Sequence, residues 1–332
     1  MNRFMRALRE HVLILDGAMG TMLQARGLKA GDCPEQMILD APEVVEAVHR
    51  EYAEAGADVI VSNTFGANRT KLAHYGLEDR VHQINTRAIE LARTGGGEGV
   101  YVVGCMGPSG RFLEPVGDAG FDEMVEVFSE QVRAFVAAGA DAISCETFLD
   151  IRELKAAVMA CQECSDLPVV AMMTFDDEGR TVLGTSPEAA AVTLDALQVD
   201  VIGSNCGLGI EGMYEMLCQM RACTSRPLIA QANAGLPILQ DGETVFPATP
   251  EEMTLYHERL IELGVRIIGG CCGTTPEHIR AMRAALDGKE QYWQPPQRSH
   301  GYLSSRTSVS AFAPASRCAI IGERINPTGK KA

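Results

Sequence analysis

The feature that most constrains the fold is a short aliphatic segment that recurs eight times along the chain. Each segment ends in small or polar residues and is followed by a stretch with helical character. Their nearly continuous Val and Ile content is typical of strands buried on both faces, as in a parallel sheet. The segments are VLILDG (12–17), DVIVSNTF (58–65), VYVVGC (100–105), DAISCETF (141–148), PVVAMMTF (168–175), VDVIGSNCG (199–207), PLIAQANAG (227–235) and VRIIGGCCG (265–273).

The stretches between these segments have the apolar period of amphipathic helices. In the stretch 121–141, the apolar residues at helical spacing are Phe121, Met124, Val125, Phe128, Val132 and Phe135. Eight β/α units predict a closed (β/α)8 barrel of the TIM type. The alternative is an open doubly wound sheet, but the turn after the first segment reads DGAMGT and lacks the G-x-G-x-x-G fingerprint of that fold.

The pattern of alternating segments ends near residue 287, although the chain has 332 residues. The stretch 288–317 is rich in Pro, Ser and Arg without sustained periodicity, which is typical of an interdomain linker. The last residues, CAIIGERINPTGKKA, look like the first strand of a further domain that is cut off soon after it begins. We therefore predict a barrel over 1–287, a linker over 288–317 and the start of a second domain over 318–332.

The overall charge restricts the partners that the chain can bind. A formal net charge of −15 repels nucleic-acid phosphates and anionic lipid surfaces, so neither nucleic acid nor membrane is an expected partner. The chain lacks the apolar segment of a secretory signal, and no stretch is long enough for a membrane span. We expect a cytoplasmic protein, in which the eleven cysteines are not assumed to form disulfides.

Three of the cysteines lie where a barrel would bring them together. Cys206 ends the sixth segment, and Cys271 and Cys272 end the eighth. The carboxyl ends of all barrel strands open onto one face, so these thiols should meet at the barrel mouth. Three thiolates are good zinc ligands and leave a fourth tetrahedral position open for substrate. Gly269, Gly270 and Gly273 would let the backbone bend around the pair.

The alternative for these three residues is simple burial, since free cysteine is among the most buried residue types. Cys161 and Cys164 form a C-x-x-C, but it lies in a helical pattern where the two residues share a face, so a redox role is not expected. The remaining cysteines lack a partner arrangement, and burial is their default: Cys33, Cys105, Cys145, Cys218, Cys223 and Cys318.

Two acidic residues also lie at predicted strand ends. Asp16 closes the first segment and precedes Gly17, Ala18 and Met19, whose backbone amides at a helix start could receive a carboxylate. A helix N-cap is the alternative role for Asp16. Glu146 closes the fourth segment and could pair with an ammonium group or form a structural ion pair at the rim. Thiolates, acids and a carboxylate-binding turn together match an amino acid that bears a thiol, such as homocysteine.

The motifs LDGAMGTMLQ, SNTFGANRTKL, SCETF, GSNCG and GGCCGTTPEHI occur in this order, and together they resemble the homocysteine S-methyltransferase family from Val12 to Ala285. The resemblance implies that Cys206, Cys271 and Cys272 bind zinc. It also implies that Asp16 and Glu146 receive the homocysteine ammonium group and that the turn from Gly17 through Ala18 to Met19 receives its carboxylate.

The family likeness extends to a fourth metal position and to the end of the chain. Asn233 matches a position that can fill the fourth zinc site without substrate, although a turn asparagine is the alternative. The segment IGERINPTGKK resembles the start of the pterin-binding domain that follows the homocysteine domain in cobalamin-dependent members. This implies a methyl group that comes from methyltetrahydrofolate and is delivered by methylcobalamin on a domain absent from this chain.

In this interpretation the zinc ion keeps homocysteine deprotonated near neutral pH, so no side chain is needed as a general base. Two alternatives remain open. One is a homocysteine methyltransferase that uses betaine or S-methylmethionine, which would share the zinc motif but lack the start of a pterin-binding domain. The other is a zinc-binding scaffold without catalytic activity.

Overall fold

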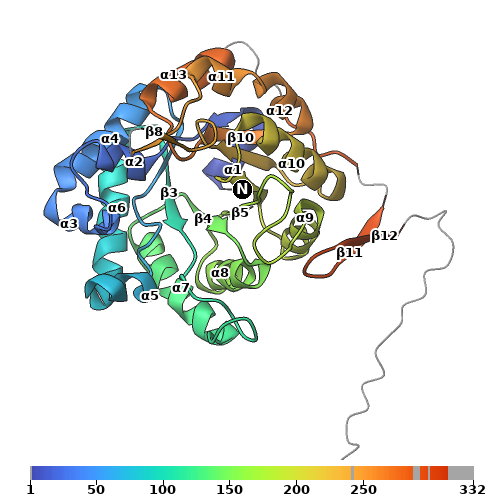
Figure 1. Cartoon of the computed structure of the whole chain (residues 1–332), viewed down its shortest axis with the longest axis horizontal. Coiled ribbons are helices and arrows are strands. Elements are labelled where there is room, and N and C mark those ends of the chain that lie inside the picture. Colours follow the sequence, from blue (N-terminus) through green and yellow to red (C-terminus); the bar gives the residue numbers. More distant parts are fainter. Residues whose placement is uncertain (1, 241–242, 287–291, 298–299, 313–332) are drawn as a thin grey trace, which may run out of the picture.

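The structure is a computed structural model, which describes residues 2–240, 243–286, 292–297 and 300–312. Its centre is a barrel of eight parallel strands, surrounded by helices (Figure 1). All eight aliphatic segments form the predicted strands, so the predicted (β/α)8 barrel is confirmed. Within the described residues no helix is long and apolar enough to cross a membrane.

The strands are β1 (Leu13–Ile14), β2 (Val59–Val61), β3 (Tyr101–Met106), β4 (Ala142–Phe148), β5 (Val169–Met173), β6 (Val201–Asn205), β7 (Leu228–Ala232), β8 (Ile238–Gln240), β9 (Glu243–Val245), β10 (Val265–Gly270), β11 (Gly301–Ser304) and β12 (Val309–Phe312). The α-helices are α1 (Arg3–Glu10), α2 (Met19–Gln24), α3 (Met37–Asp40), α4 (Pro42–Glu54), α5 (Arg69–Leu72), α6 (Val81–Gly96), α7 (Phe121–Ala137), α8 (Ile151–Cys164), α9 (Pro187–Ala196), α10 (Ile210–Cys223), α11 (Pro250–Thr254), α12 (His257–Leu263) and α13 (Pro276–Leu286).

The barrel strands pair in the order β1-β10-β7-β6-β5-β4-β3-β2, and every pair is parallel. A parallel bridge between Leu15 and Val59 joins β1 to β2 and closes the ring. β8 and β9 form a separate antiparallel hairpin in the connection after β7. Because the ring is closed, the carboxyl ends of all eight strands surround one mouth.

Alternate residues of each strand belong to two different cores. On β5, Val170 and Met172 pack inside the barrel, whereas Val169, Ala171 and Met173 pack against the surrounding helices. Both sets are buried, which explains the continuous apolar segments in the sequence.

Helix α1 covers the amino-terminal end of the barrel. Phe4 and Leu8 lie one helical turn apart on the face that packs with the interior strand residues, and both are fully buried. The helix starts at Asn2, whose side chain accepts a hydrogen bond from the Phe4 amide at 2.8 Å. The Phe4 ring meets Tyr101 edge to face, with 5.5 Å between the centroids. This end of the barrel is therefore filled by side chains.

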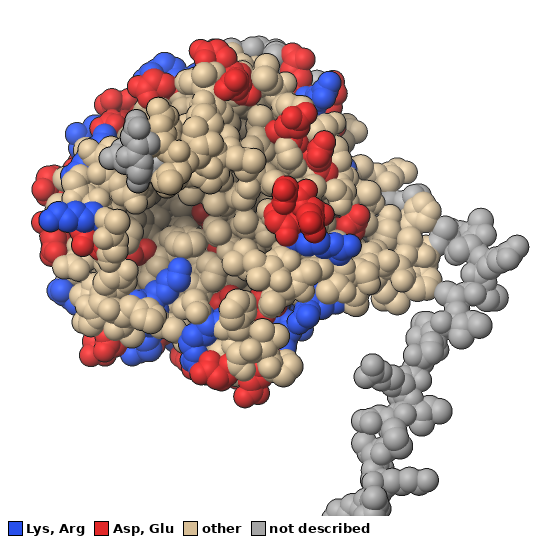
Figure 2. Space-filling model, in the orientation of Figure 1, with Lys and Arg blue, Asp and Glu red and all other residues tan. Residues whose placement is uncertain are grey.

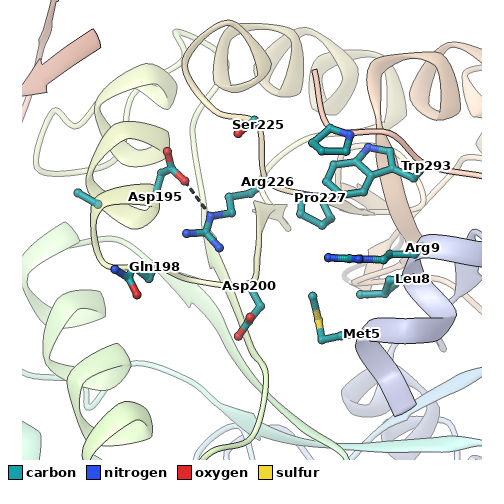
Figure 3. A pocket seen from close by; sticks show the side chains of 12 residues that line it. Met5, Leu8, Arg9, Asp195, Gln198, Asp200, Ser225, Arg226, Pro227 and Trp293 are labelled. Carbon is teal, nitrogen blue, oxygen red and sulfur yellow. Dashed lines mark hydrogen bonds and ion pairs between the residues drawn. The ribbon is translucent and has the colours of Figure 1, made fainter. Parts of the chain in front are cut away.

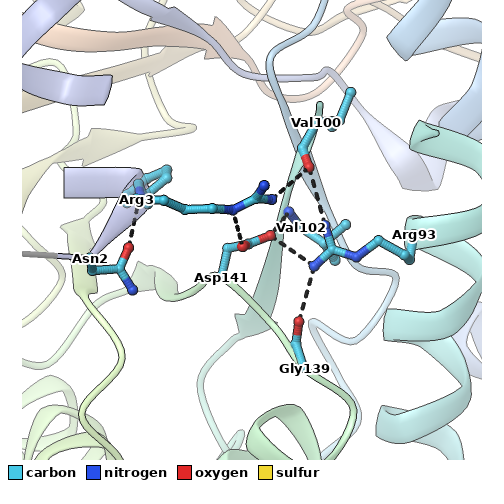
Figure 4. Close-up of polar contacts among 8 residues, drawn as sticks. Asn2, Arg3, Arg93, Val100, Val102, Gly139 and Asp141 are labelled. Carbon is cyan, nitrogen blue, oxygen red and sulfur yellow. Dashed lines mark hydrogen bonds and ion pairs between the residues drawn. The ribbon is translucent and has the colours of Figure 1, made fainter. Parts of the chain in front are cut away.

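Asp141 links α1 to the barrel strands (Figure 4). Its carboxylate accepts hydrogen bonds from Arg3 and Arg93, each at 2.8 Å, and from the Val102 amide at 2.9 Å. Burial works to raise the pKa of Asp141, but the hydrogen bonds from Arg3, Val102 and Arg93 outweigh it and lower the pKa below its ordinary value. The network holds the start of α1 against β3 and the turn before β4.

We expect Phe4→Ala to lower the free energy of unfolding by about 3–5 kcal/mol, as is typical for removing a buried Phe side chain. The substitution leaves a cavity under the barrel, where packed strands on all sides cannot collapse to fill it. Urea denaturation measures the change. Arg6→Ala is the matched control, since Arg6 is exposed on the same helix. Equal stability of the two variants would show that α1 does not contribute to the core.

The predicted linker contains more structure than its sequence suggested. β11 and β12 form an antiparallel hairpin, and Tyr302 and Val309 pack against the core between the barrel strands and the helices. The Tyr302 hydroxyl donates to the Ala222 carbonyl at 2.9 Å, and Arg180 donates to the Thr307 carbonyl at 2.9 Å. The sequence did not predict this hairpin, because its contacts with the barrel leave no local period. The proposed domain start at 318–332 lies outside the described residues.

Candidate metal and substrate site

The three predicted cysteines meet at the barrel mouth. Cys206 follows β6, and Cys271 and Cys272 follow β10. Their sulfur atoms all lie within 4.8 Å of one another, and Cys206 Sγ is 3.9 Å from Cys272 Sγ. All three side chains are partly exposed, and the molecule is hollowed near the centre of the barrel, with acidic atoms inside the hollow (Figure 2). The cluster can therefore be reached from outside.

The backbone at these two loops is tied to the end of β7. The amide of Cys206 donates to the Gln231 carbonyl at 3.1 Å, and that of Cys271 donates to the Ala232 carbonyl at 2.7 Å. Cys206 itself has a φ of 59°, in the left-handed region that residues other than glycine seldom adopt. The fold thus holds this cysteine in a costly conformation, and such strain clusters at functional sites.

The glycines near the cysteine pair have two different roles. Gly273 has a φ of 80°, so it supplies the predicted bend. Gly269 and Gly270 belong to β10 and have no positive φ. A Cβ on Gly269 would lie 2.5 Å from Leu15 Cβ, and one on Gly270 would lie 2.3 Å from Thr274 Oγ1. Glycine is needed at these two positions because Leu15 and Thr274 leave no room for a side chain, and not because the backbone bends there.

The three thiols share their protons unequally. Hydrogen bonds from the thiols of Cys271 and Cys272 lower the pKa of Cys206 to about 2. The same sharing raises the pKa of Cys271, and it raises the pKa of Cys272 to about 11. Because a metal binds cysteine as the thiolate, a cation at this cluster would displace the protons that the thiols share.

The geometry of the cluster fits a zinc ion. Zinc–sulfur bonds of about 2.3 Å at tetrahedral angles place two sulfurs about 3.8 Å apart, close to the 3.9 Å between Cys206 and Cys272. Among the described residues this is the one group of three or more Cys, His, Asp or Glu side chains with metal-site spacing. Asn233 lies beside it and accepts a hydrogen bond from the Cys272 amide through Oδ1 at 3.1 Å.

Asp16 lies in the barrel mouth with one carboxylate oxygen unused. Oδ2 accepts a hydrogen bond from the Val61 amide at 2.9 Å, whereas Oδ1 is buried without a partner among the described residues. Burial raises the pKa of Asp16 well above its ordinary value, and nearby Glu146 adds to the rise despite the Val61 hydrogen bond. Helix α2 has Ala18 at its N-cap, so the alternative role of Asp16 as N-cap was wrong.

Glu146 has a similar environment on β4. It is buried, and its Oε1 lacks a hydrogen-bond partner in the described part of the chain. Burial raises the pKa of Glu146 above its ordinary value, although hydrogen bonds from neighbouring side chains oppose this. None of the ion pairs seen in that part of the chain includes Glu146, so the structure does not support the alternative of a rim ion pair. Two buried carboxylates with unused oxygens form a site that would accept a cationic group.

The turn between β1 and α2 is partly occupied by the protein itself. The Ala18 amide donates to Thr274 Oγ1 at 3.1 Å, so this amide already has an acceptor. Met19 is the first residue of α2, and the first amides of a helix have no acceptor within it. Gly17 is closely surrounded, because a Cβ there would lie 2.6 Å from Thr274 Oγ1.

Two residues that the sequence did not single out, Tyr52 and Thr274, hold this turn against the cysteine loop. The Tyr52 hydroxyl lies 2.9 Å from the Ala18 carbonyl and 3.0 Å from the Thr274 carbonyl. Thr274 Oγ1 also donates to the Cys271 carbonyl at 2.7 Å. Thr274 follows the cysteine motif directly, which is a weak signal, but nothing in the sequence near Tyr52 indicates such a role.

Most of the other cysteines behave as expected. Cys33, Cys105, Cys145, Cys161 and Cys223 are buried. Cys161 and Cys164 belong to helix α8, as the helical pattern predicted. Cys218 is only half-buried, so the expectation of burial was wrong for this residue. Cys318 lies outside the described residues.

One cavity lies at the opposite end of the barrel from the cysteines. It measures about 720 Å³ and lies at the amino-terminal end of the barrel, between α1 and the segments that lead into β6 and β7 (Figure 3). Its lining includes Arg9, Asp200 and Trp293 and none of the predicted site residues. The carboxyl-terminal mouth remains the candidate site because the unused polar groups and the thiols gather there.

Two curated relatives are methionine synthases. The chain is 35% identical over 345 aligned positions to the methionine synthase of Mycobacterium tuberculosis and 34% identical over 351 to that of Mycobacterium leprae. These alignments cover 98% of this chain but 28% and 29% of the two relatives. The chain thus spans less than a third of their length.

Solved structures agree with this picture. The metallated form of the homocysteine methyltransferase MmuM from Escherichia coli superposes with a TM-score of 0.73 at 26% identity, covering 84% of this chain and 99% of that one. Its oxidised form gives a TM-score of 0.71 at 27% identity, covering 85% and 99%. The profile of the homocysteine S-methyltransferase family matches residues 13–286, which include every predicted site residue. The barrel, the three thiols at its mouth and this match together show that the chain belongs to the homocysteine S-methyltransferase family.

Proposed function

We propose that this chain binds zinc through Cys206, Cys271 and Cys272 and activates homocysteine for methyl transfer from methylcobalamin, giving methionine. The observation that carries the proposal is the meeting of three thiols with two buried acidic side chains at one barrel mouth. Family membership supplies the reaction class. The proposal adds three points to family membership: the identity of the metal, the methyl donor and the roles of individual residues.

The three cysteines would leave one position of a tetrahedral zinc ion for substrate. Zinc supplies one chemical effect, which is to favour the thiolate form of homocysteine near neutral pH. Three negatively charged cysteines exceed the charge of the ion, so they would leave electron density on the substrate sulfur. We assign Asn233 to the fourth position when substrate is absent; a lone pair of Oδ1 that the Cys272 amide does not use would be the ligand.

The amino-acid part of homocysteine would be held by the acids and the adjacent turn. We assign the substrate ammonium group to Asp16 and Glu146, whose unused oxygens need a hydrogen-bond donor. The substrate carboxylate would lie at the turn from Gly17 through Ala18 to Met19. Because Ala18 donates to Thr274, the amides of Gly17 and Met19 are the ones expected to receive it.

The methyl donor is inferred from the relatives and from the end of the chain. Relatives named methionine synthase are more than three times as long as this chain, which leaves room for further domains. We propose that residues 1–287 are the homocysteine barrel, 288–317 a linker and 318–332 the start of a pterin-binding domain. Homocysteine and the cobalamin- and pterin-binding domains would then be the partners, in the cytoplasm.

The test is a comparison of methyl donors. We expect the purified chain, supplied with zinc and homocysteine, to form methionine from methylcobalamin, which can be followed by the change in the cobalamin absorption spectrum. Betaine and S-methylmethionine, assayed in parallel, should give no product. Turnover with betaine or S-methylmethionine would show that methylcobalamin is not the required donor. The broader proposal of a zinc-dependent homocysteine methyltransferase would still stand. Zinc binding without turnover on any donor would favour the scaffold interpretation.

A further inference from the structure

Asn205 is a buried amide that lies directly before the metal-binding Cys206. It ends strand β6, and its side chain is fully buried. The side chain reaches Thr147 near the end of β4, although β5 lies between these two strands in the sheet. The contact thus joins the ends of two strands that are not neighbours, directly beside the residue that precedes Cys206.

The orientation of the Asn205 amide is fixed by the backbone. The Thr147 amide can only donate, so the oxygen of Asn205 must face it, at 2.8 Å. The nitrogen Nδ2 then donates to Thr147 Oγ1 at 2.8 Å. Because an NH2 group carries two hydrogens, one hydrogen of Asn205 remains after this contact.

The second hydrogen of Asn205 has a sulfur atom within reach. Nδ2 lies 3.9 Å from Cys271 Sγ, a long contact for a hydrogen bond to sulfur. Thr147, which fixes the amide, has a φ of 60°, unusual for a β-branched residue. The pairing of β4 with β5 shifts register between Cys145 and Phe148, at the same place. The fold thus maintains a strained residue where it orients Asn205 towards Cys271.

We propose that Asn205 is a positioning residue for the metal centre, which donates an N–H···S hydrogen bond to the Cys271 thiolate under the control of Thr147. The inference rests on the proposed function, since it requires that the three cysteines bind a metal. A thiolate that ligates zinc carries negative charge, and a charge-assisted hydrogen bond stabilises it. A donor beside Cys271 would help the site to hold three cysteine thiolates and then a fourth, anionic sulfur from substrate.

The test compares metal binding by four variants. Asn205→Ala removes the whole amide. Asn205→Asp retains an oxygen for the Thr147 amide and another to which the Thr147 hydroxyl can donate, but it removes the donor to sulfur and adds a negative charge beside Cys271. Thr147→Val removes the hydroxyl that orients Nδ2, and Thr147→Ser retains it. Zinc affinity is measured by competition with a chromophoric chelator, and the cysteine ligands are observed through the charge-transfer absorption of bound Co²⁺.

We expect both Asn205 variants to bind zinc about 10- to 100-fold more weakly than the unchanged chain, as is typical for residues that support metal ligands. Their Co²⁺ charge-transfer band should move to longer wavelength, because a thiolate without its hydrogen bond gives up an electron more easily. Thr147→Val should show smaller changes of the same sign, and Thr147→Ser should match the unchanged chain. Thr147→Val provides the answer if the alanine variant does not fold, because it changes no charge and its comparison with Thr147→Ser isolates the hydroxyl that orients Nδ2.

Two results would overturn the inference in different ways. If the unchanged chain binds metal, and the Asn205 variants have its affinity and its spectrum but a lower melting temperature, Asn205 is structural only. The proposed function would then stand. If the unchanged chain binds neither Zn²⁺ nor Co²⁺, the proposed zinc site fails and the role of Asn205 fails with it.

Discussion

Cys206→Ala, Cys271→Ala and Cys272→Ala are each expected to lower zinc content and homocysteine methylation by more than about 100-fold. Each variant removes one of three protein ligands, and loss of residues that merely support ligands already costs about 10- to 100-fold. The thiols lie in loops after β6 and β10, so the buried strands do not depend on them. Elemental analysis for zinc and an assay for methionine measure the two effects.

Cys218→Ala is the matched control for these variants, because Cys218 is half-buried on α10 and lies outside the cluster. It should retain full zinc content. Without zinc, all four variants should melt close to the unchanged chain, and added zinc should stabilise only the unchanged chain and the control. A Cys206, Cys271 or Cys272 variant that retains full zinc would remove that residue from the ligand set.

The sequence predicted the barrel and the position of the cysteines for the same physical reason. Strands covered on both faces must be continuously apolar, so all eight could be recognised locally. Once a closed barrel is assumed, every strand end lies at one mouth, and Cys206 meets Cys271 without further information. Asp16 and Glu146 were found in the same way, because each follows or ends an aliphatic segment.

Other parts of the fold depend on contacts that leave no local pattern. Helix α1 buries only Phe4 and Leu8. Two apolar residues do not predict where a helix packs, and the place of α1 is evident only once the end of the barrel that it covers is known. The hairpin of β11 and β12 is fixed by contacts with the barrel, such as Tyr302 with Ala222. The positive φ of Thr147 is likewise set by tertiary structure, since the sequence favours an ordinary strand there.

The acidic side chains Asp16 and Glu146 lower the stability of the ligand-free protein, and this cost accompanies their proposed role in binding the substrate ammonium group. In the ligand-free protein, burial raises the pKa values of Asp16 and Glu146. The folded state then binds more protons than the unfolded state at pH values between the ordinary and the raised pKa. Stability therefore falls as pH rises through this window. A bound ammonium group would offset the cost by pairing with the charged carboxylates.

Glu146→Gln is accordingly expected to change binding and stability in opposite directions. The amide retains the shape of the side chain but not its charge, so homocysteine binding should weaken by about 2 kcal/mol, the low end for losing one partner of a buried charge pair. Zinc content should stay unchanged, because Glu146 is assigned to the ammonium group. Without ligand, the variant should melt at a higher temperature than the unchanged chain at neutral pH.

The pH dependence separates this role from a general effect of a buried acid. The stability of the unchanged chain relative to Glu146→Gln should decline as pH rises above 4.5, the ordinary pKa of the group, and level off above the raised value. Glu153→Gln is the control, since Glu153 is also buried with a raised pKa but accepts hydrogen bonds from Ser109 outside the site. It should leave homocysteine affinity unchanged in isothermal titration. If Glu146→Gln lost zinc and homocysteine to the same extent, Glu146 would instead support the metal loops, and Asp16 alone would remain to bind the substrate ammonium group.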